Sequence, residues 1–408
     1  MSVKIFTNDI EKMAKKQVMD LANTPAFSKY KIRIMPDVHA GAGCVIGFTA
    51  SLGKKVIPNI VGVDIGCGML VEKLSLPLDD IDLSLLDDTI RKNIPTGFRI
   101  NSEDGIFPKI KKLKCLSQLK NSNRFLKSLG TLGGGNHFIE LDKGTNSDIY
   151  LVVHTGSRNL GKQVCDYYQK LAESKLSLNS KKIEQRKKKI IKENTKKGTK
   201  ERIQKELECL KNELKKNYAD TPKEFAFLTG KDRQDYLHDM KICQEFAQIN
   251  RDLICSCIIN NYNKIAVNKL DVISKFETVH NYISFKDNII RKGAVSARKS
   301  EKIIIPINMR DGSLIAIGKG NKDWNRSAPH GAGRLMSRKQ AKETVSIKEY
   351  KDAMKGIFST TVNVNTIDEA PQAYKPIDEI IKNIEPTAHI IEVIKPVFNF
   401  KDDTSGKN

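Results

Sequence analysis

The amino-acid sequence predicts a mixed α+β fold in which strands and helices do not alternate regularly. Short apolar runs, among them KIRIM, VIGFTA, IYLVVH and KIIIPI, have the character of strands. The segments 80–128, 162–262 and 336–385 instead have a largely helical pattern. A chain of 408 residues, 39% of them hydrophobic, is long enough to bury one large core or two modest ones.

Glycine-rich segments flank the expected strands. Of the 26 glycines, 17 lie in five short segments, namely 41–47, 62–68, 130–135, 156–161 and 312–333. Glycine beside His, Asn and Ser is typical of backbone that turns tightly or approaches a ligand closely. We therefore expect these segments to be loops at strand ends, where functional sites are usually built.

The most basic part of the chain is 181–220, with 15 Lys and Arg residues against 7 Asp and Glu residues. Its apolar residues recur at spacings of three, four and seven, which predicts amphipathic helices interrupted near Gly198. We expect a helical excursion from the main body. A solvated basic face is the usual interpretation of such a charge run, and an RNA-guiding surface is the alternative.

Charge and composition limit the class of protein. The chain has 70 Lys and Arg residues against 48 Asp and Glu residues, a formal charge of +22, which favours a polyanionic partner without identifying it. No stretch approaches the roughly 20 apolar residues of a membrane span, and the N-terminus has no apolar signal region, so we expect a cytoplasmic protein without membrane contact. Eight cysteines without a CxxC pair predict reduced thiols.

Five of the seven histidines lie in or beside distinctive polar or glycine-rich contexts. They are His39 in MPDVHAGAG, His137 in GTLGGGNHFIE, His154 in VVHTGSRNLG, His280 in VHNYISF and His330 in SAPHGAGRLMSR. Any one of them could be a structural histidine. Their joint occurrence favours a common site.

Asp64 and Cys67, three residues apart in VGVDIGCGM, add a carboxylate and a thiolate to these imidazoles. Such a mixed donor set suits divalent manganese, zinc, iron or cobalt better than calcium or magnesium. A thiolate can bridge two ions, which would give a binuclear site of the kind used in phosphoryl transfer.

His330 differs from the other histidines because it follows a proline and precedes a Gly-Ala-Gly turn with Arg334 after it. Backbone amides and a cation suit an anionic phosphate, and histidine can accept a phosphoryl or nucleotidyl group covalently. A metal-ligand role and a structural capping role are the alternatives.

Eight motifs together resemble the RtcB family of GTP- and manganese-dependent RNA ligases, in that family's order. They are MPDVHAGAG, VGVDIGCGM, GTLGGGNHFIE, HTGSRNLG, HNY, RKGAVSAR, SAPHGAGRLMSR and DEAPQAYK. The resemblance runs from about residue 30 to the end of the chain. It implies one catalytic domain over residues 1–408, with central β-sheets, surrounding helices and a basic helical insertion at 176–220.

The resemblance also implies the site residues. Two manganese ions would be held by Cys67, His137 and His154 and by Asp64, Cys67 and His280, with the thiolate shared. His330 would be the nucleophile that carries GMP, with Asp37 and Arg158 near the RNA termini. Glu140 would bind the guanine edge, Tyr374 would flank the nucleotide and Lys401 would lie near the base. The GTP-binding positions would be Asn136, His137, Phe138, Glu140, His280, Asn281, Pro306, Ile307, Asn308, Met309, Ser313, His330, Gly331, Ala332, Gly333, Tyr374 and Lys401.

The chemistry that the resemblance implies has three steps. His330 is guanylylated by GTP, an RNA 3′-phosphate takes the GMP, and a 5′-hydroxyl displaces GMP to form a phosphodiester. A 2′,3′-cyclic phosphate would first be opened. Because neutral His330 is the nucleophile, acid pH should suppress the first step. The chain departs from many relatives by reading PINM at 306–309 in place of PGSM, and by a tail that extends past Lys401.

Two other functions fit the same residues. A binuclear metallophosphoesterase acting on RNA ends is the alternative enzyme, and a non-catalytic RNA-binding module relying on the charge of +22 is the third. Transfer-RNA splicing and RNA repair present the same chemical ends, and the motifs do not indicate whether an activating protein takes part.

Overall fold

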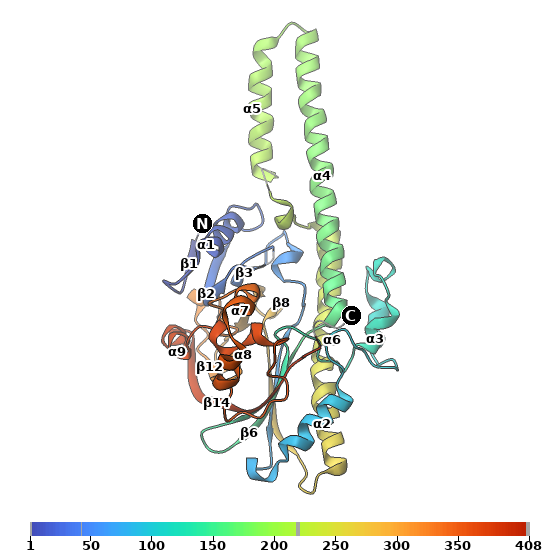
Figure 1. Ribbon diagram of the computed structural model, residues 1–408. Coiled ribbons are helices and arrows are strands. Elements are labelled where there is room, and N and C mark those ends of the chain that lie inside the picture. The colour runs from blue at the N-terminus through green and yellow to red at the C-terminus, as the bar shows by residue number, and fades with distance from the viewer. Residues whose placement is uncertain (1, 42, 218–220, 405–408) are drawn as a thin grey trace.

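The computed structural model describes residues 2–41, 43–217 and 221–404, whose strands form three sheets (Figure 1). The first sheet has the order β1-β2-β3-β9-β8, and only its β1–β2 pair is parallel. A second sheet pairs β10 with β13. The strands of these two sheets are β1 (Ser2–Ile5), β2 (Lys31–His39), β3 (Ile46–Ser51), β8 (Asn281–Ser284), β9 (Ile289–Lys292), β10 (Ala294–Ser296) and β13 (Ser327–Pro329).

The third sheet is antiparallel throughout and has the order β11-β12-β14-β5-β6-β4-β7. Its strands are β4 (Gly68–Leu74), β5 (Phe138–Lys143), β6 (Ile149–Thr155), β7 (Val272–Val279), β11 (Lys302–Asn308), β12 (Gly312–Gly318) and β14 (Ala388–Phe400). The edge strands β11 and β7 approach each other, because the Ile304 N–H donates to the Thr278 hydroxyl at 3.1 Å. The sheet therefore curls, and its strand ends face a common region.

Helices cover the sheets. They are α1 (Lys12–Ala22), α2 (Leu83–Asn93), α3 (Asn123–Lys127), α4 (Arg158–Lys196), α5 (Lys200–Asn217), α6 (Gly230–Ile265), α7 (Arg338–Thr344), α8 (Ile347–Ala353) and α9 (Ile377–Ile384). None of the helices in the described part of the chain has both the length and the apolar character needed to cross a membrane.

The long helix α6 connects the two largest apolar cores. Its first half, including Tyr236 and Phe246, packs with α1, α4 and the first sheet, where Phe48 is fully buried. Its second half, including Ile254 and Ile258, packs with α2 and one face of the seven-stranded sheet. Both sheets therefore pack against the same helix, which fixes the position of one sheet relative to the other.

The mixed α+β prediction is confirmed, and each apolar run predicted as a strand forms one. The break near Gly198 is also confirmed, because α4 ends at Lys196 and α5 begins at Lys200. The helical predictions for 80–128 and 336–385 are partly wrong. Between α2 and α3, and between α8 and α9, the chain forms only short 3-10 turns and loops, and two of the turns begin at a proline, Pro108 and Pro371.

Candidate active site

Five side chains with metal-binding atoms converge where strands of the seven-stranded sheet begin or end. Cys67 directly precedes β4, His137 precedes β5, His154 lies near the end of β6 and His280 follows β7. His154 is the register partner of both Met69 and Phe138, and the His280 N–H donates to the Cys67 carbonyl at 2.9 Å. Hydrogen bonding between neighbouring strands thus brings together ligands that lie far apart in sequence.

The Cys67 thiol lies at the centre of the group. Its Sγ is 3.4 Å from His154 Nε2 and 3.6 Å from His137 Nε2. His154 Nε2 is 3.4 Å from His280 Nε2, and His137 Nε2 is 3.0 Å from Asp64 Oδ2. The donor atoms therefore form two groups that share Cys67: Cys67, His154 and His280, and Asp64, Cys67 and His137.

This grouping differs from the one that the resemblance implies. The sequence resemblance assigned His137 together with His154 and placed His280 with Asp64. In the structure His137 contacts Asp64, whereas His280 lies against His154. Asp64 and His137 both lie in loops, whereas His280 follows β7 and its N–H donates to the Cys67 carbonyl.

The protonation state of these groups fits a divalent cation. The Nδ1 atoms of His137 and His154 bond to the carbonyl oxygens of Leu132 and Asn136 at 2.8 and 3.1 Å. A carbonyl only accepts, so each Nδ1 carries the proton and each Nε2 lone pair faces Cys67, the arrangement found in metal sites. Burial lowers the pKa of His154 well below its usual value, so this imidazole stays neutral as a ligand must.

The chemistry of the Cys67 thiol also favours a bound cation. Burial, and secondly the charge of Asp64, raises the pKa of Cys67 well above its usual value. A coordinating metal deprotonates such a thiol outright. Burial alone would raise the pKa of Asp64, but the neighbouring His137 and the charge of Arg158 lower it. The group is a candidate Cys/His metal site with one carboxylate beside it.

His330 lies next to this cluster, with its ring centroid 5.0 Å from that of His280. Its Nδ1 bonds to Asp37 Oδ2 at 2.5 Å, and its backbone N–H donates to the same oxygen at 3.1 Å. A carboxylate at Nδ1 fixes the proton there and leaves the Nε2 lone pair free. Asp37 was expected near the RNA termini, but it is fully buried and holds His330. His39, whose Nδ1 bonds to the Asp37 carbonyl at 2.9 Å, contributes to the same support.

A cavity of about 300 Å³ opens beside His330. Thirteen of the predicted nucleotide positions line it, namely Asn136, Phe138, Glu140, Pro306, Ile307, Asn308, Met309, His330, Gly331, Ala332, Gly333, Tyr374 and Lys401. Four others do not. His137 and His280 belong to the metal-binding cluster, the Asn281 side chain accepts from the Gly293 N–H, and Ser313 is fully buried in β12. Directly after the PINM segment, Arg310 pairs with Asp311 and does not line the cavity.

Glu140 and Lys401 both line this cavity, and the charge of Lys401 acts on Glu140. Lys401 is 4% exposed, so the tail beyond β14 does bring this lysine into the cavity wall. The Asn399 side chain donates to Glu140 at 2.6 Å. Burial raises the pKa of Glu140 to about 7, although Asn399 and Lys401 oppose the shift.

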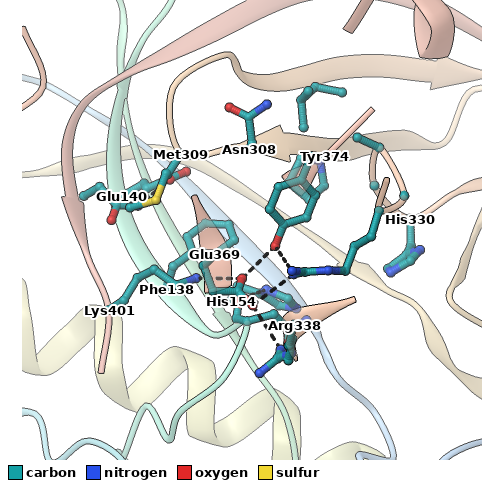
Figure 2. A pocket seen from close by; sticks show the side chains of 18 of the residues that line it. Phe138, Glu140, His154, Asn308, Met309, His330, Arg338, Glu369, Tyr374 and Lys401 are labelled. Carbon is teal, nitrogen blue, oxygen red and sulfur yellow. Dashed lines mark hydrogen bonds and ion pairs between the residues drawn. The ribbon is translucent and has the colours of Figure 1, made fainter. Parts of the chain in front are cut away.

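Glu369 is the residue that sequence reasoning missed. It is 5% exposed, and four side chains meet at its carboxylate, as Figure 2 shows for Tyr374, Arg338 and Lys401. Tyr374 donates to it at 2.7 Å, Arg338 at 3.1 Å, Arg334 at 3.3 Å and Lys401 at 3.4 Å. The signal was present, because Glu369 lies in the quoted motif DEAPQAYK, but no role had been assigned to it.

A second cavity, of about 550 Å³, lies on the other side of the metal-binding cluster. Asp64, Arg124, Arg158 and Phe98 are among its lining residues. Arg158 Nε donates to the Thr131 hydroxyl at 3.1 Å, and Arg158 NH2 donates to the Gly97 carbonyl at 3.0 Å. These bonds fix the guanidinium near Asp64. Most of the predicted site residues therefore line one of two cavities or belong to the metal-binding cluster.

Comparison with known proteins shows to which family the sequence is similar. The chain matches the family model described as tRNA-splicing ligase RtcB over residues 17–121 and 100–402. It is 28% identical to the RNA-splicing ligase RtcB of Escherichia coli K12 over 97% of this chain and 96% of the relative. It is 25% identical to the tRNA-splicing ligase RtcB of Nanoarchaeum equitans, over 98% and 94%. The corresponding protein of Thermococcus kodakarensis is 24% identical, over 97% and 93%.

Proposed function

The chain belongs to the RtcB family of RNA ligases, and from that membership we propose the reaction that its site performs. It joins an RNA 3′-phosphate or 2′,3′-cyclic phosphate end to a 5′-hydroxyl end, in RNA repair or tRNA splicing, through GMP carried on His330. The observation that carries the proposal is the placement of His330, with Asp37 at Nδ1, the metal-binding cluster on one side and the 300 Å³ cavity on the other.

His330 Nε2 is the nucleophile of the first step. It attacks the α-phosphorus of GTP, so that an N–P bond forms while the bond from phosphorus to the pyrophosphate oxygen breaks. The ring gains positive charge, which Asp37 at 2.5 Å offsets. An oxygen of the RNA 3′-phosphate then attacks the same phosphorus and the N–P bond breaks. Finally the 5′-hydroxyl attacks the RNA phosphorus and GMP leaves.

The nucleotide would bind in the 300 Å³ cavity. Glu140 is placed to accept hydrogen bonds from the guanine edge, a role that requires its ionised form. Arg334, Arg338 and Lys401 line the same cavity, where Glu140 and Glu369 are the acidic lining residues, so three cations stand against two carboxylates. This excess of cations favours a triphosphate.

The metal-binding cluster fits two divalent cations, and we propose manganese. One would be held by Cys67, His154 and His280 and the other by Asp64, Cys67 and His137. When bound, such ions neutralise phosphate charge and align an in-line attack. The soft thiolate and the imidazoles with a single carboxylate support an ion of the manganese or zinc class.

RNA ends would enter through the 550 Å³ cavity, where Arg158 lies beside Asp64. We also propose that residues 1–408 form one catalytic domain, with 176–220 as a basic helical insertion in it. The support for an insertion is that α6 contributes to both major cores while α4 and α5 continue beyond them (Figure 1).

Incubation with α-labelled GTP and manganese, followed by denaturation, tests the proposal. We expect label to remain on the wild-type chain and on the control His389→Ala, whose histidine is exposed on β14, and to be absent from His330→Ala. Hydrolysis of RNA ends without retained label would instead support the metallophosphoesterase. RNA binding that survives both His330→Ala and Cys67→Ala as the only measurable activity would support a binding module.

A further inference from the structure

Helices α4 and α5 form an arm, residues 176–217, that extends beyond the rest of the molecule (Figure 1). The first part of α4 is fixed to the body. Tyr168 donates to Asp239 at 2.8 Å, Gln169 donates to the Lys223 carbonyl at 2.9 Å, and Lys175 pairs with Asp232. Beyond these contacts α4 packs against α5, where the Asn194 side chain donates to Glu206 at 3.0 Å.

The arm is continuous with the active site. Helix α4 begins at Arg158, whose charge acts on Asp64, and runs for 39 residues, or about 58 Å, to the tip of the arm. The tip is closed by the Thr199 hydroxyl, which donates to Asn194 Oδ1 at 2.9 Å, and Asn194 is only 7% exposed. One rigid element therefore connects the tip to the catalytic centre.

Five exposed lysines form a stripe on α4: Lys170, Lys181, Lys188, Lys192 and Lys196. Their spacings of 11, 7, 4 and 4 residues keep them within an arc of about 100°. The same arc contains Asn159, which lines the 550 Å³ cavity. Among the residues that the structure describes, none forms an ion pair with these lysines. Lys187 and Lys189, which are not part of the stripe, instead pair with Glu184 and Glu193.

The surface beside the start of α4 is basic as well. Residues 105–137 contain no Asp or Glu, and Lys111, Lys112, Lys114 and Lys120 in this segment are exposed. The segment lies against α4, because the Lys120 N–H donates to Gln163 at 2.7 Å. Cations thus extend from the cavity along α4 to the tip, without acidic residues in the loop that flanks its base.

We propose that the α4 lysine stripe is a docking track for the phosphate backbone of a structured RNA whose ends lie in the active site. This inference rests on the proposed function, because the ligase supplies the polyanion and fixes where its ends are. From Asn159 to Lys196 the track extends about 56 Å, or roughly 20 base-pair steps of an A-form RNA helix at about 2.8 Å per step. The track selects RNAs with a long helical stem next to the break and contributes little to short RNAs.

The test replaces all five stripe lysines by glutamine: Lys170→Gln, Lys181→Gln, Lys188→Gln, Lys192→Gln and Lys196→Gln. A matched control makes the same charge change at exposed lysines of α1, α8 and α9: Lys12→Gln, Lys15→Gln, Lys348→Gln, Lys351→Gln and Lys382→Gln. Two RNAs are compared, one with its ends on a stem of about 20 base pairs and one of about five nucleotides, which reaches about 17 Å.

We expect the stripe variant to bind the long RNA on the order of 10- to 100-fold more weakly at 0.1 M salt. The slope of log affinity against log salt concentration should be smaller in magnitude by about 3 to 4, because the phosphate contacts of the stripe are lost. Binding of the short RNA, guanylylation and the control variant should remain as in the wild type. Undiminished binding of the long RNA, or an equal loss in the control, would overturn the track and leave a solvated face or a surface for an acidic protein. Absence of guanylylation in the wild-type chain would overturn the proposed function instead.

Discussion

Replacing Asp37 by asparagine should prevent His330 Nε2 from acting as the nucleophile while leaving the fold intact. Asp37 Oδ2 accepts from both the Nδ1–H and the backbone N–H of His330, and Oδ1 has no hydrogen-bond partner among the described residues. Asparagine has nearly the same shape, but its amide nitrogen only donates. If this nitrogen faces the ring, Nδ1 must become the acceptor and the proton moves to Nε2, the atom that has to attack phosphorus.

The size of the effect follows from the two contributions of the carboxylate. It selects the tautomer with a free Nε2, and it stabilises the positive ring that forms when Nε2 bonds to phosphorus. The same substitution beside the histidine of a serine-protease triad, where an aspartate has both roles, lowers the rate about 10⁴-fold. We expect a loss of about 10³- to 10⁴-fold in guanylylation, which is about 4 to 5.5 kcal/mol in barrier height.

The assay is single-turnover transfer of label from α-labelled GTP to the chain under saturating manganese. Equilibrium binding of a non-hydrolysable GTP analogue is measured in parallel and should change less than about threefold, because Asp37 is fully buried and does not line the nucleotide cavity. The conservative control is Asp37→Glu, which retains the acceptor and should lose less activity than the asparagine variant. A guanylylation rate for Asp37→Asn within about tenfold of wild type would refute the tautomer argument.

Three further predictions follow from the site. The raised pKa of Glu140, about 7 against its usual 4.5, means that the folded state favours the protonated acid, so this group costs stability as pH rises from 4.5 through 7. Glu140→Gln should therefore raise the melting temperature more at pH 8 than at pH 5, and a stability difference that does not depend on pH would contradict this expectation. The GTP affinity of the wild type should improve as pH rises through 7, because the ionised acid binds the guanine edge. Cys67→Ala should remove both bound Mn²⁺ ions and His280→Ala only one, as measured by metal analysis after gel filtration, since only the thiol belongs to both groups; equal losses would contradict the shared thiol. Glu369→Gln leaves the buried Lys401 ammonium without its carboxylate and should destabilise the fold by about 3 to 5 kcal/mol in thermal or urea unfolding, with part of the loss recovered by added GTP; a loss below about 1 kcal/mol would show that the cations do not depend on this acid.

The metal-binding cluster could be predicted from the sequence because Cys67, His137 and His280 directly adjoin strands and His154 lies near the end of one. An apolar run followed or preceded by His or Cys places that side chain at a sheet end, and antiparallel pairing brings several ends together, as it does for Cys67 and His154. The division into two groups could not be predicted in the same way. It depends on the turn at Gly66, with φ of +75°, which fixes where Asp64 lies relative to the Cys67 sulfur, and no periodicity describes such a turn.

Glu369 was missed for a different reason. Glu369 lies in a 3-10 turn, η7 (Ile367–Glu369), within a long irregular segment that the sequence made to look helical. Its role arises only when the C-terminal tail beyond β14 brings Lys401 to it across 32 residues of sequence. Side chains that meet through chain reversal of this kind have no local signature, so a charge in an irregular segment is indistinguishable from an exposed one until the fold is known.

The loop that precedes β5 explains why one motif, GTLGGGNHFIE, combines so many glycines with a metal ligand. Gly134 and Gly135 line the 550 Å³ cavity, Asn136 and Phe138 line the 300 Å³ cavity, and His137 projects into the metal-binding cluster between them. The glycines make room for an arginine on each side. A Cβ at Gly133 would collide with the Arg158 guanidinium, and a Cβ at Gly135 would lie 3.2 Å from Arg338 NH1. Both positions also have φ near +80°, where other residues are strained. Substituting either glycine should therefore displace one arginine and leave the other. Gly133→Ala should displace Arg158 and weaken binding of RNA ends in the 550 Å³ cavity, whereas Gly135→Ala should displace Arg338 and weaken GTP binding in the 300 Å³ cavity.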